Sequence, residues 1–157
     1  MSQVWSDAES VESLAEGLIS SHHPELATAT FRYIFKEKAS SKGGKKIYGS
    51  VKKMSEEGKF LTAGNPDFVV IVALECWNEL DSNKRLALVD HLLERCTGEE
   101  DDKGEMKWST RDPDVHEFAS ILSRHGTWTE SLENFASVAA SLDSAIPTVQ
   151  ERVTTRN

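Results

Sequence analysis

One ten-residue stretch near the middle of the chain, residues 87–96, carries side chains at a spacing that could bind a metal ion. In the pattern H-E-x-x-H on a helix, two imidazoles one turn apart bind Zn²⁺ and the intervening glutamate activates the metal-bound water. His91 occupies the first histidine position, whereas Leu92 stands at the glutamate position and Arg95 at the second histidine position. No carboxylate at position 92 can take a proton from water, and the permanently charged Arg95 would repel the ion. The stretch therefore predicts a degenerate metal site with no catalytic residue.

The hydrophobic spacing around this stretch predicts an α+β fold in which a central helix packs on a small sheet. That helix is expected over residues 83–96, with Asp81 or Ser82 as its N-cap. The most apolar run, residues 67–74, is bounded by turn residues and is expected to be the central buried strand. Further helices are expected over 6–20, 115–125 and 129–142, and further strands over 30–36 and 45–53, giving an antiparallel or mixed sheet of about three strands.

The length and the cysteine content limit how the chain can be organised. At 157 residues it can bury its own core, and we expect one domain over residues 1–150 followed by a frayed tail at 151–157. No apolar run is long enough for a membrane span, and the first residues lack the pattern of a signal peptide. The two cysteines, Cys76 and Cys96, are too few for a disulfide framework. We therefore expect free thiols in a reducing cytoplasm.

The formal net charge is −8, because 26 acidic residues outnumber 18 lysines and arginines. This balance argues against a general nucleic-acid binder, which needs a positive face for phosphate contacts. It suits an acidic surface presented to a basic partner. The candidate partner-binding residues lie in an acidic loop expected over 97–107, and they are Glu99, Glu100, Asp101 and Asp102.

Lysines gather in a different part of the chain, between residues 36 and 59. They are either the solvated lysines that protect an edge strand or a local patch that contacts nucleic acid. The possible basic patch consists of Lys45, Lys46, Lys52 and Lys53.

Several stretches, taken together in order, resemble a known family. They are His23-Pro24-Glu25-Leu26, Pro66-Asp67-Phe68-Val69-Val70-Ile71, Trp77-Asn78-Glu79-Leu80, Ala87-Leu88-Val89-Asp90-His91, Asp114-Val115-His116-Glu117-Phe118-Ala119 and Arg124-His125-Gly126. Over residues 22–130 the chain resembles small metallopeptidases encoded by bacteriophages and prophages, which are zincin-like in their motif. The resemblance implies a helix that reads D-H-E-L-x-H, with zinc on the two histidines, the glutamate as general base, and an acidic residue of a later D-V-x-E-F helix as the third ligand.

This chain matches the family pattern only in part. Asp90 and His91 match the start of the motif, Leu92 and Arg95 depart from it, and Glu117 matches the candidate third ligand. We expect Arg95 to pair with Glu117, which would replace a metal bridge between two helices by a salt bridge.

A rescued zinc site would need altered ligands. The candidates are His91, Cys96, His116 and Glu117. Cys96 lies five residues after His91, about 140° round a helix from it, so that pair is poorly placed. His91 and Glu117 alone give two ligands where a catalytic zinc site needs three. We therefore expect no bound cofactor, with zinc as the alternative.

The sequence thus favours a catalytically inactive, zincin-like phage protein located in the cytoplasm of the host cell. We expect it to bind a host protein that has a basic surface, and so to inhibit a defence or nucleic-acid enzyme. Two alternatives stay open, a zinc metallopeptidase with altered ligands and a nucleic-acid-binding protein that uses the lysine-rich segment 36–59.

Overall fold

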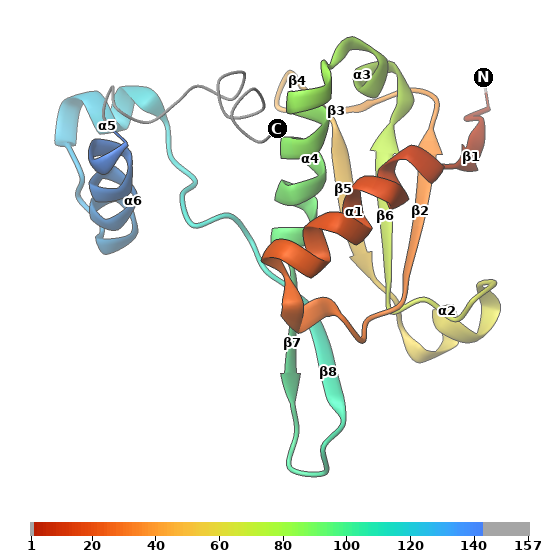
Figure 1. The fold of residues 1–157 in the computed structure, drawn as a ribbon. Coiled ribbons are helices and arrows are strands. Elements are labelled where there is room, and N and C mark those ends of the chain that lie inside the picture. The colour runs from red at the N-terminus through yellow and green to blue at the C-terminus, as the bar shows by residue number, and fades with distance from the viewer. Residues whose placement is uncertain (1, 143–157) are drawn as a thin grey trace. The chain divides into compact units, whose positions relative to one another are not determined.

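The computed structural model describes residues 2–142, and these form two compact units, one ending at Arg111 and the other starting at Asp112. Each unit is described by itself. The elements confirm the α+β class (Figure 1). A single domain over 1–150 stays a prediction, and the predicted tail at 151–157 lies outside the described residues. Within the described part, no helix is both long and apolar enough to cross a membrane.

The first unit is built on a mixed four-stranded sheet of order β1-β2-β6-β5. Its strands are β1 (Trp5–Asp7), β2 (Phe31–Lys36), β5 (Gly49–Lys53) and β6 (Phe68–Ala73). The two central strands, β2 and β6, are parallel, and both outer strands are antiparallel to their neighbours. The β-branched and aromatic composition of β2 and β6 suits this central, half-covered position.

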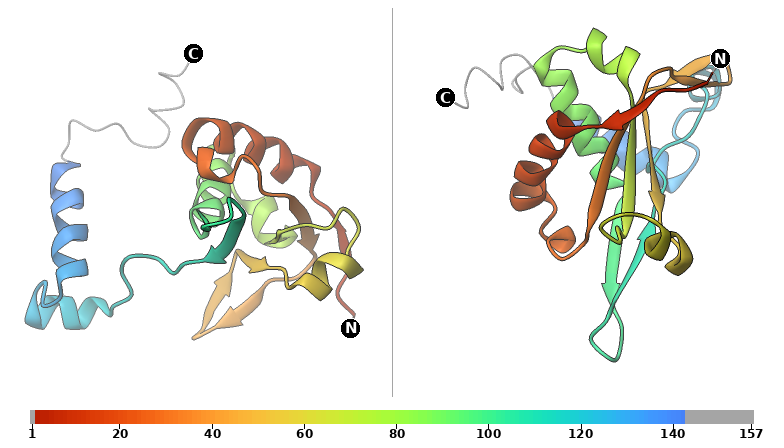
Figure 2. Two further views of the ribbon diagram at one scale, coloured as in Figure 1. Left: turned by 90° about the horizontal axis from the view of Figure 1, so that it is seen from below. Right: turned by 90° about the vertical axis from the view of Figure 1, so that its right-hand side faces the viewer.

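One face of the sheet is covered by the helices α1 (Glu9–His22) and α4 (Ser82–Glu94), as two further views show (Figure 2). Alternate residues of the central strands point to this side because successive side chains of a strand face opposite ways. The core consists mainly of Tyr33, Phe35, Phe68, Val70 and Val72 from the sheet, with Val11, Ala15 and Leu18 from α1 and Val89, Leu92 and Leu93 from α4.

Smaller elements surround this core. They are the short helices η1 (Pro24–Leu26), α2 (Glu56–Leu61) and α3 (Leu74–Glu79), and two hairpins, β3 (Ser40–Lys42) with β4 (Lys45–Ile47) and β7 (Cys96–Glu100) with β8 (Met106–Thr110). The second unit contains α5 (Ala119–His125) and α6 (Glu130–Ser141).

Several predicted boundaries were wrong, each for a physical reason. The first helix begins at Glu9 and not near residue 6, because Trp5–Asp7 pair with β2 as a strand. The expected strand over 45–53 is two strands with different partners, β3 for Lys45–Ile47 and β6 for Gly49–Lys53. The expected acidic loop over 97–107 contains most of the β7–β8 hairpin. The helix expected over 115–125 starts only at Ala119.

Candidate functional site

Helix α4 carries the positions that the motif analysis singled out, and its local structure explains why it forms. The Asp81 side chain caps the helix by accepting a hydrogen bond of 2.9 Å from the Lys84 amide, so Asp81 and not Ser82 is the N-cap. Val89, Leu92 and Leu93 are buried against the sheet and supply the apolar stripe. The helix prediction is confirmed, with an end at Glu94 and Arg95 as the C-cap.

The motif positions of α4 do not provide a zinc site. His91 is exposed, and Leu92, at the position of the catalytic glutamate, is only 1% exposed. A Cβ atom built on Gly49 of β5 would lie 2.8 Å from Leu92 Cδ1, so the leucine fills space directly above that strand. Arg95 is a permanent cation where a second imidazole is required. One imidazole, one buried alkyl group and one guanidinium do not make the donor set of a zinc ion.

Of the other candidate ligands, Glu117 makes local hydrogen bonds and His116 is exposed. Glu117 precedes α5, where its Oε1 accepts a hydrogen bond of 2.8 Å from the Phe118 amide and its Oε2 accepts one of 3.2 Å from Trp128 Nε1. His116, the residue before Glu117, is exposed. It lies before the start of α5, although the sequence predicted a helix over residues 115–125 that includes it. Both residues belong to the second unit, and the pairing of Arg95 with Glu117 stays a prediction.

Cys96 is a buried free thiol at the start of β7. Its Sγ lies 3.7 Å from the Leu92 carbonyl oxygen, to which it donates a weak hydrogen bond. Burial raises the pKa of the Cys96 thiol to about 12, so the thiolate form that binds metals is scarce at neutral pH.

A different set of groups meets on the neighbouring face of α4. His23 ends α1 as its C-cap residue and is only 2% exposed. Its Nε2 lies 2.6 Å from Asp90 Oδ1, and its Nδ1 lies 3.6 Å from Glu94 Oε2. The guanidinium of Arg111 donates a hydrogen bond to the other oxygen of Glu94, and Arg111 Nε donates to the Glu94 carbonyl oxygen at 3.0 Å. We call His23, Asp90 and Glu94 the His23 cluster.

Sequence reasoning missed the His23 cluster, although a signal was present. Asp90 and Glu94 are four residues apart and therefore share one face of a helix. What no local pattern could indicate is that His23, 67 residues before Asp90, lies against that face.

A comparison with protein-family models shows the family to which the chain belongs. The family model described as "Putative phage metallopeptidase" matches residues 3–140. The chain belongs to this phage metallopeptidase family. No curated protein matches the chain, and no solved structure matches it. The predicted resemblance is therefore confirmed, and it extends well beyond the stretches on which it was first based.

In this phage metallopeptidase-like chain, the predicted acidic residues lie on the β7–β8 hairpin. Asp101 builds its turn, because its Oδ1 accepts hydrogen bonds of 2.9 Å from the amides of Lys103 and Glu105. The hydrogen bond from the Glu105 amide is the main cause of a lowered pKa of the Asp101 carboxyl. The bond from the Lys103 amide and the positive charge of Lys107 lower this pKa further. Glu99, Glu100 and Asp102 are exposed.

The hairpin is held firmly at its base. Trp108 of β8 packs edge-on against Phe68 of the core, with ring centroids 5.9 Å apart. A Cβ atom on Gly98 would lie 2.4 Å from the Trp108 ring, so only glycine allows the two strands to close here. Figure 1 shows the tip of the hairpin extending beyond the sheet of the first unit. The acidic side chains are thus presented on a projecting arm with an ordered base.

The predicted basic patch is divided between two strands. Lys45 and Lys46 lie on β4, and Lys52 and Lys53 lie on β5, where neighbouring residues face opposite sides of the sheet. Lys46 Nζ also lies 3.6 Å from the Glu75 carboxylate. A hydrogen bond from the Ala39 amide, followed by the charges of Lys46 and of a neighbouring lysine, lowers the pKa of Glu75.

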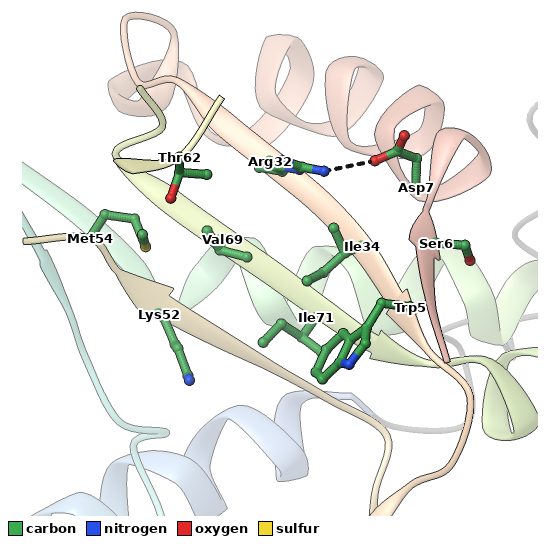
Figure 3. Close-up of a pocket in the computed structure, with 10 residues that line it drawn as sticks. All are labelled: Trp5, Ser6, Asp7, Arg32, Ile34, Lys52, Met54, Thr62, Val69 and Ile71. Atoms are coloured by element: carbon green, nitrogen blue, oxygen red, sulfur yellow. Dashed lines mark hydrogen bonds and ion pairs between the residues drawn. The ribbon is translucent and has the colours of Figure 1, made fainter. Parts of the chain in front are cut away.

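The face of the sheet opposite the helices contains an open hollow (Figure 3). Its floor is apolar and consists of Ile34, Val69 and Ile71, with Trp5 beside it. Arg32 and Asp7 form an ion pair of 3.2 Å at its edge. The sequence reading did not predict this surface because it did not include β1, which supplies Trp5 and Asp7.

Proposed function

We propose that this family member does not hydrolyse peptides and acts by binding a host protein through the acidic β7–β8 hairpin. The observation that carries the proposal is the burial of Leu92. The position at which a metallopeptidase helix needs a carboxylate is here a core position, only 1% exposed and packed over Gly49. A carboxylate there would be desolvated without a partner, which is strongly unfavourable.

The hairpin supplies a physical means of binding. Glu99, Glu100 and Asp102 are exposed near the tip of the arm, while Asp101 keeps the turn in shape. An acidic projection raises the association rate with a basic surface and helps to select it over neutral surfaces. Proteins that act on nucleic acids carry such basic surfaces, so an enzyme of host defence or nucleic-acid metabolism is the partner class that fits.

The test compares two variants with the same loss of charge. The hairpin variant carries Glu99→Gln, Glu100→Gln and Asp102→Asn, and the control variant carries glutamine at the exposed residues Glu12, Glu16 and Glu37. Tagged wild-type protein and the control are expected to recover the same host protein from infected cells, and the hairpin variant is expected to lose it. With the purified partner, affinity should fall as salt concentration rises. Equal recovery by the hairpin variant would contradict the proposal.

Hydrolysis is tested separately. Purified protein supplied with Zn²⁺ is expected to leave a peptide library uncleaved. Cleavage that is abolished by a chelator, and by His91→Ala, would instead favour the metallopeptidase with altered ligands.

Nucleic-acid binding through residues 36–59 is less well supported by the geometry. Lys46 lies close to Glu75, and Lys59 Nζ lies 2.6 Å from Asp67 Oδ1, so part of the positive charge is offset locally. A salt-dependent shift of DNA or RNA that is lost when Lys45, Lys46, Lys52 and Lys53 are neutralised would favour this function over the first.

A further inference from the structure

We propose that His23, Asp90 and Glu94 form a binding site for a divalent transition-metal ion, Zn²⁺ or Mn²⁺, separate from the motif positions of the same helix. Each of the three residues offers one ligand atom, and these atoms all lie within 4.8 Å of one another. The site goes beyond the proposed function, because it requires neither hydrolysis nor a protein partner.

The three ligands are positioned by two helices. Asp90 and Glu94 lie one turn apart on α4, and His23 is held in place where α1 ends and Pro24 begins η1. The buried imidazole has little freedom to turn away, being only 2% exposed. The ligand set therefore has one rigid member from α1 and two adjustable members from α4.

A single metal ion would bind one nitrogen of the His23 ring, so at least one of the two carboxylates must reorient to reach the same ion. With bonds of about 2.0–2.2 Å in a tetrahedral site, neighbouring ligand atoms lie about 3.3 Å apart. In the structure the two carboxylates contact different nitrogens of the ring: Nε2 lies 2.6 Å from Asp90 Oδ1, and Nδ1 lies 3.6 Å from Glu94 Oε2. The Asp90 and Glu94 side chains are 43% and 59% exposed, so both have room to rotate toward a shared ion, and one ligand atom from each of the three residues already lies within 4.8 Å of the others.

The charge around His23 favours a cation. A third carboxylate, that of Glu25, lies 3.9 Å from His23 Nδ1. Like charges four residues apart on a helix, as in Asp90 and Glu94, repel each other, and a divalent ion would offset this repulsion. Arg111 binds the other oxygen of Glu94, which fixes the orientation of that carboxylate in the manner of an outer-shell partner.

The mixed donor set indicates which metals fit. Imidazole nitrogen suits zinc and other first-row transition metals, whereas carboxylate oxygen alone suits calcium and magnesium. One nitrogen with two oxygens therefore favours Zn²⁺ or Mn²⁺ over Ca²⁺. The exposed side of Glu94, 59% accessible, leaves room for water as a further ligand.

A competing explanation uses the same residues without a metal. A protonated His23 between the carboxylates of Asp90 and Glu94 would form an ion pair that links the two helices. The two states differ in one measurable respect, because only the metal site takes up an ion.

The test uses the full chain after removal of metals with a chelator, with Zn²⁺, Mn²⁺ and Ca²⁺ as probes. Calorimetric titration is expected to show one equivalent of Zn²⁺ or Mn²⁺ bound more tightly than Ca²⁺, and the bound ion is expected to raise the midpoint of thermal unfolding. Co²⁺ should give the visible absorption of a protein-bound ion. A chain that binds none of these ions would overturn the proposal and leave the ion-pair explanation.

Matched variants locate the ion. Glu94→Gln and Asp90→Asn keep the size of each side chain and should each weaken binding about 10-fold or more. His91→Ala and His22→Ala should leave affinity unchanged, since neither residue belongs to the cluster. Loss of binding in His91→Ala with full binding in Asp90→Asn and Glu94→Gln would place the metal at the motif position and overturn the proposal. Circular dichroism of each metal-free variant checks folding, and Glu94→Gln, at an exposed position, keeps the test decisive if Asp90→Asn is unstable.

Discussion

Two neighbouring faces of helix α4 differ in their side chains and in what those side chains contact. The motif face carries His91 and Arg95, with Leu92 turned into the core, and it departs from the H-E-x-x-H pattern at two positions. The adjacent face, about 100° away because each residue of a helix turns by that angle, carries Asp90 and Glu94 against a buried histidine. The carboxylates that contact His23, those of Asp90 and Glu94, thus each lie one residue before the motif positions His91 and Arg95. A motif names positions along a helix, whereas the partners of that helix decide which positions can work together.

Among the variants that test this comparison of the two faces, the largest loss in the free energy of unfolding is expected for a substitution of Leu92. Leu92→Ala should lower the free energy of unfolding by about 2–5 kcal/mol, because it opens a cavity in the core above β5. Urea denaturation measures the loss, and Leu61→Ala, at a residue 72% exposed, is the matched control with little expected change. A loss in Leu92→Ala as small as that in the control would show that position 92 is not structural.

On the other face, Asp90→Ala should cost about 1–3 kcal/mol, because it leaves His23 buried without its partner at Nε2. The measurement is chemical denaturation with a chelator present, so that a bound ion does not contribute. Asp102→Ala, at an exposed residue of the hairpin, serves as the control. If both variants lose the same small amount of unfolding free energy, the His23 cluster contributes no more to stability than an exposed surface residue does.

The Cys96 thiol gives a test that depends on pH. Its pKa is raised from 9.0 to about 12 by burial, so folding favours the protonated form. The associated stability is fully present below pH 9 and is lost as the pH rises from about 9 through about 12. Alkylation at pH 8 should be slow in native protein and rapid in denaturant. Rapid native alkylation of Cys96 would return this residue to the list of candidate metal ligands.

The smallest effect is expected at His91. His91→Ala should change the free energy of unfolding by less than about 0.5 kcal/mol, because the side chain is exposed. Thermal and urea denaturation check this, beside Asp90→Ala measured under the same conditions. A large loss in His91→Ala would show that the motif face still makes interactions on which the fold depends.

Several elements could be predicted from the sequence because their causes are local. Helix α4 follows from an N-cap and an apolar stripe, and β6 follows from a run of β-branched residues bounded by a turn. The short strand β1 could not be predicted in the same way, because three residues carry too little pattern and its pairing with β2 defines it. The β7–β8 hairpin was missed because Gly98, Glu99 and Glu100 have low strand propensity, and the packing of Trp108 on Gly98 outweighs it.

By itself, the sequence determined the family, the α+β class and the residue types at the motif positions, because these depend on residue types at fixed spacing. Only the tertiary structure decided that Leu92 is a core residue and that His23 meets Asp90 and Glu94. The physical reason is that burial and contact depend on which distant segments pack together. His23 and Asp90 come into contact because two helices pack on the same sheet, and no local spacing in the sequence predicts that contact.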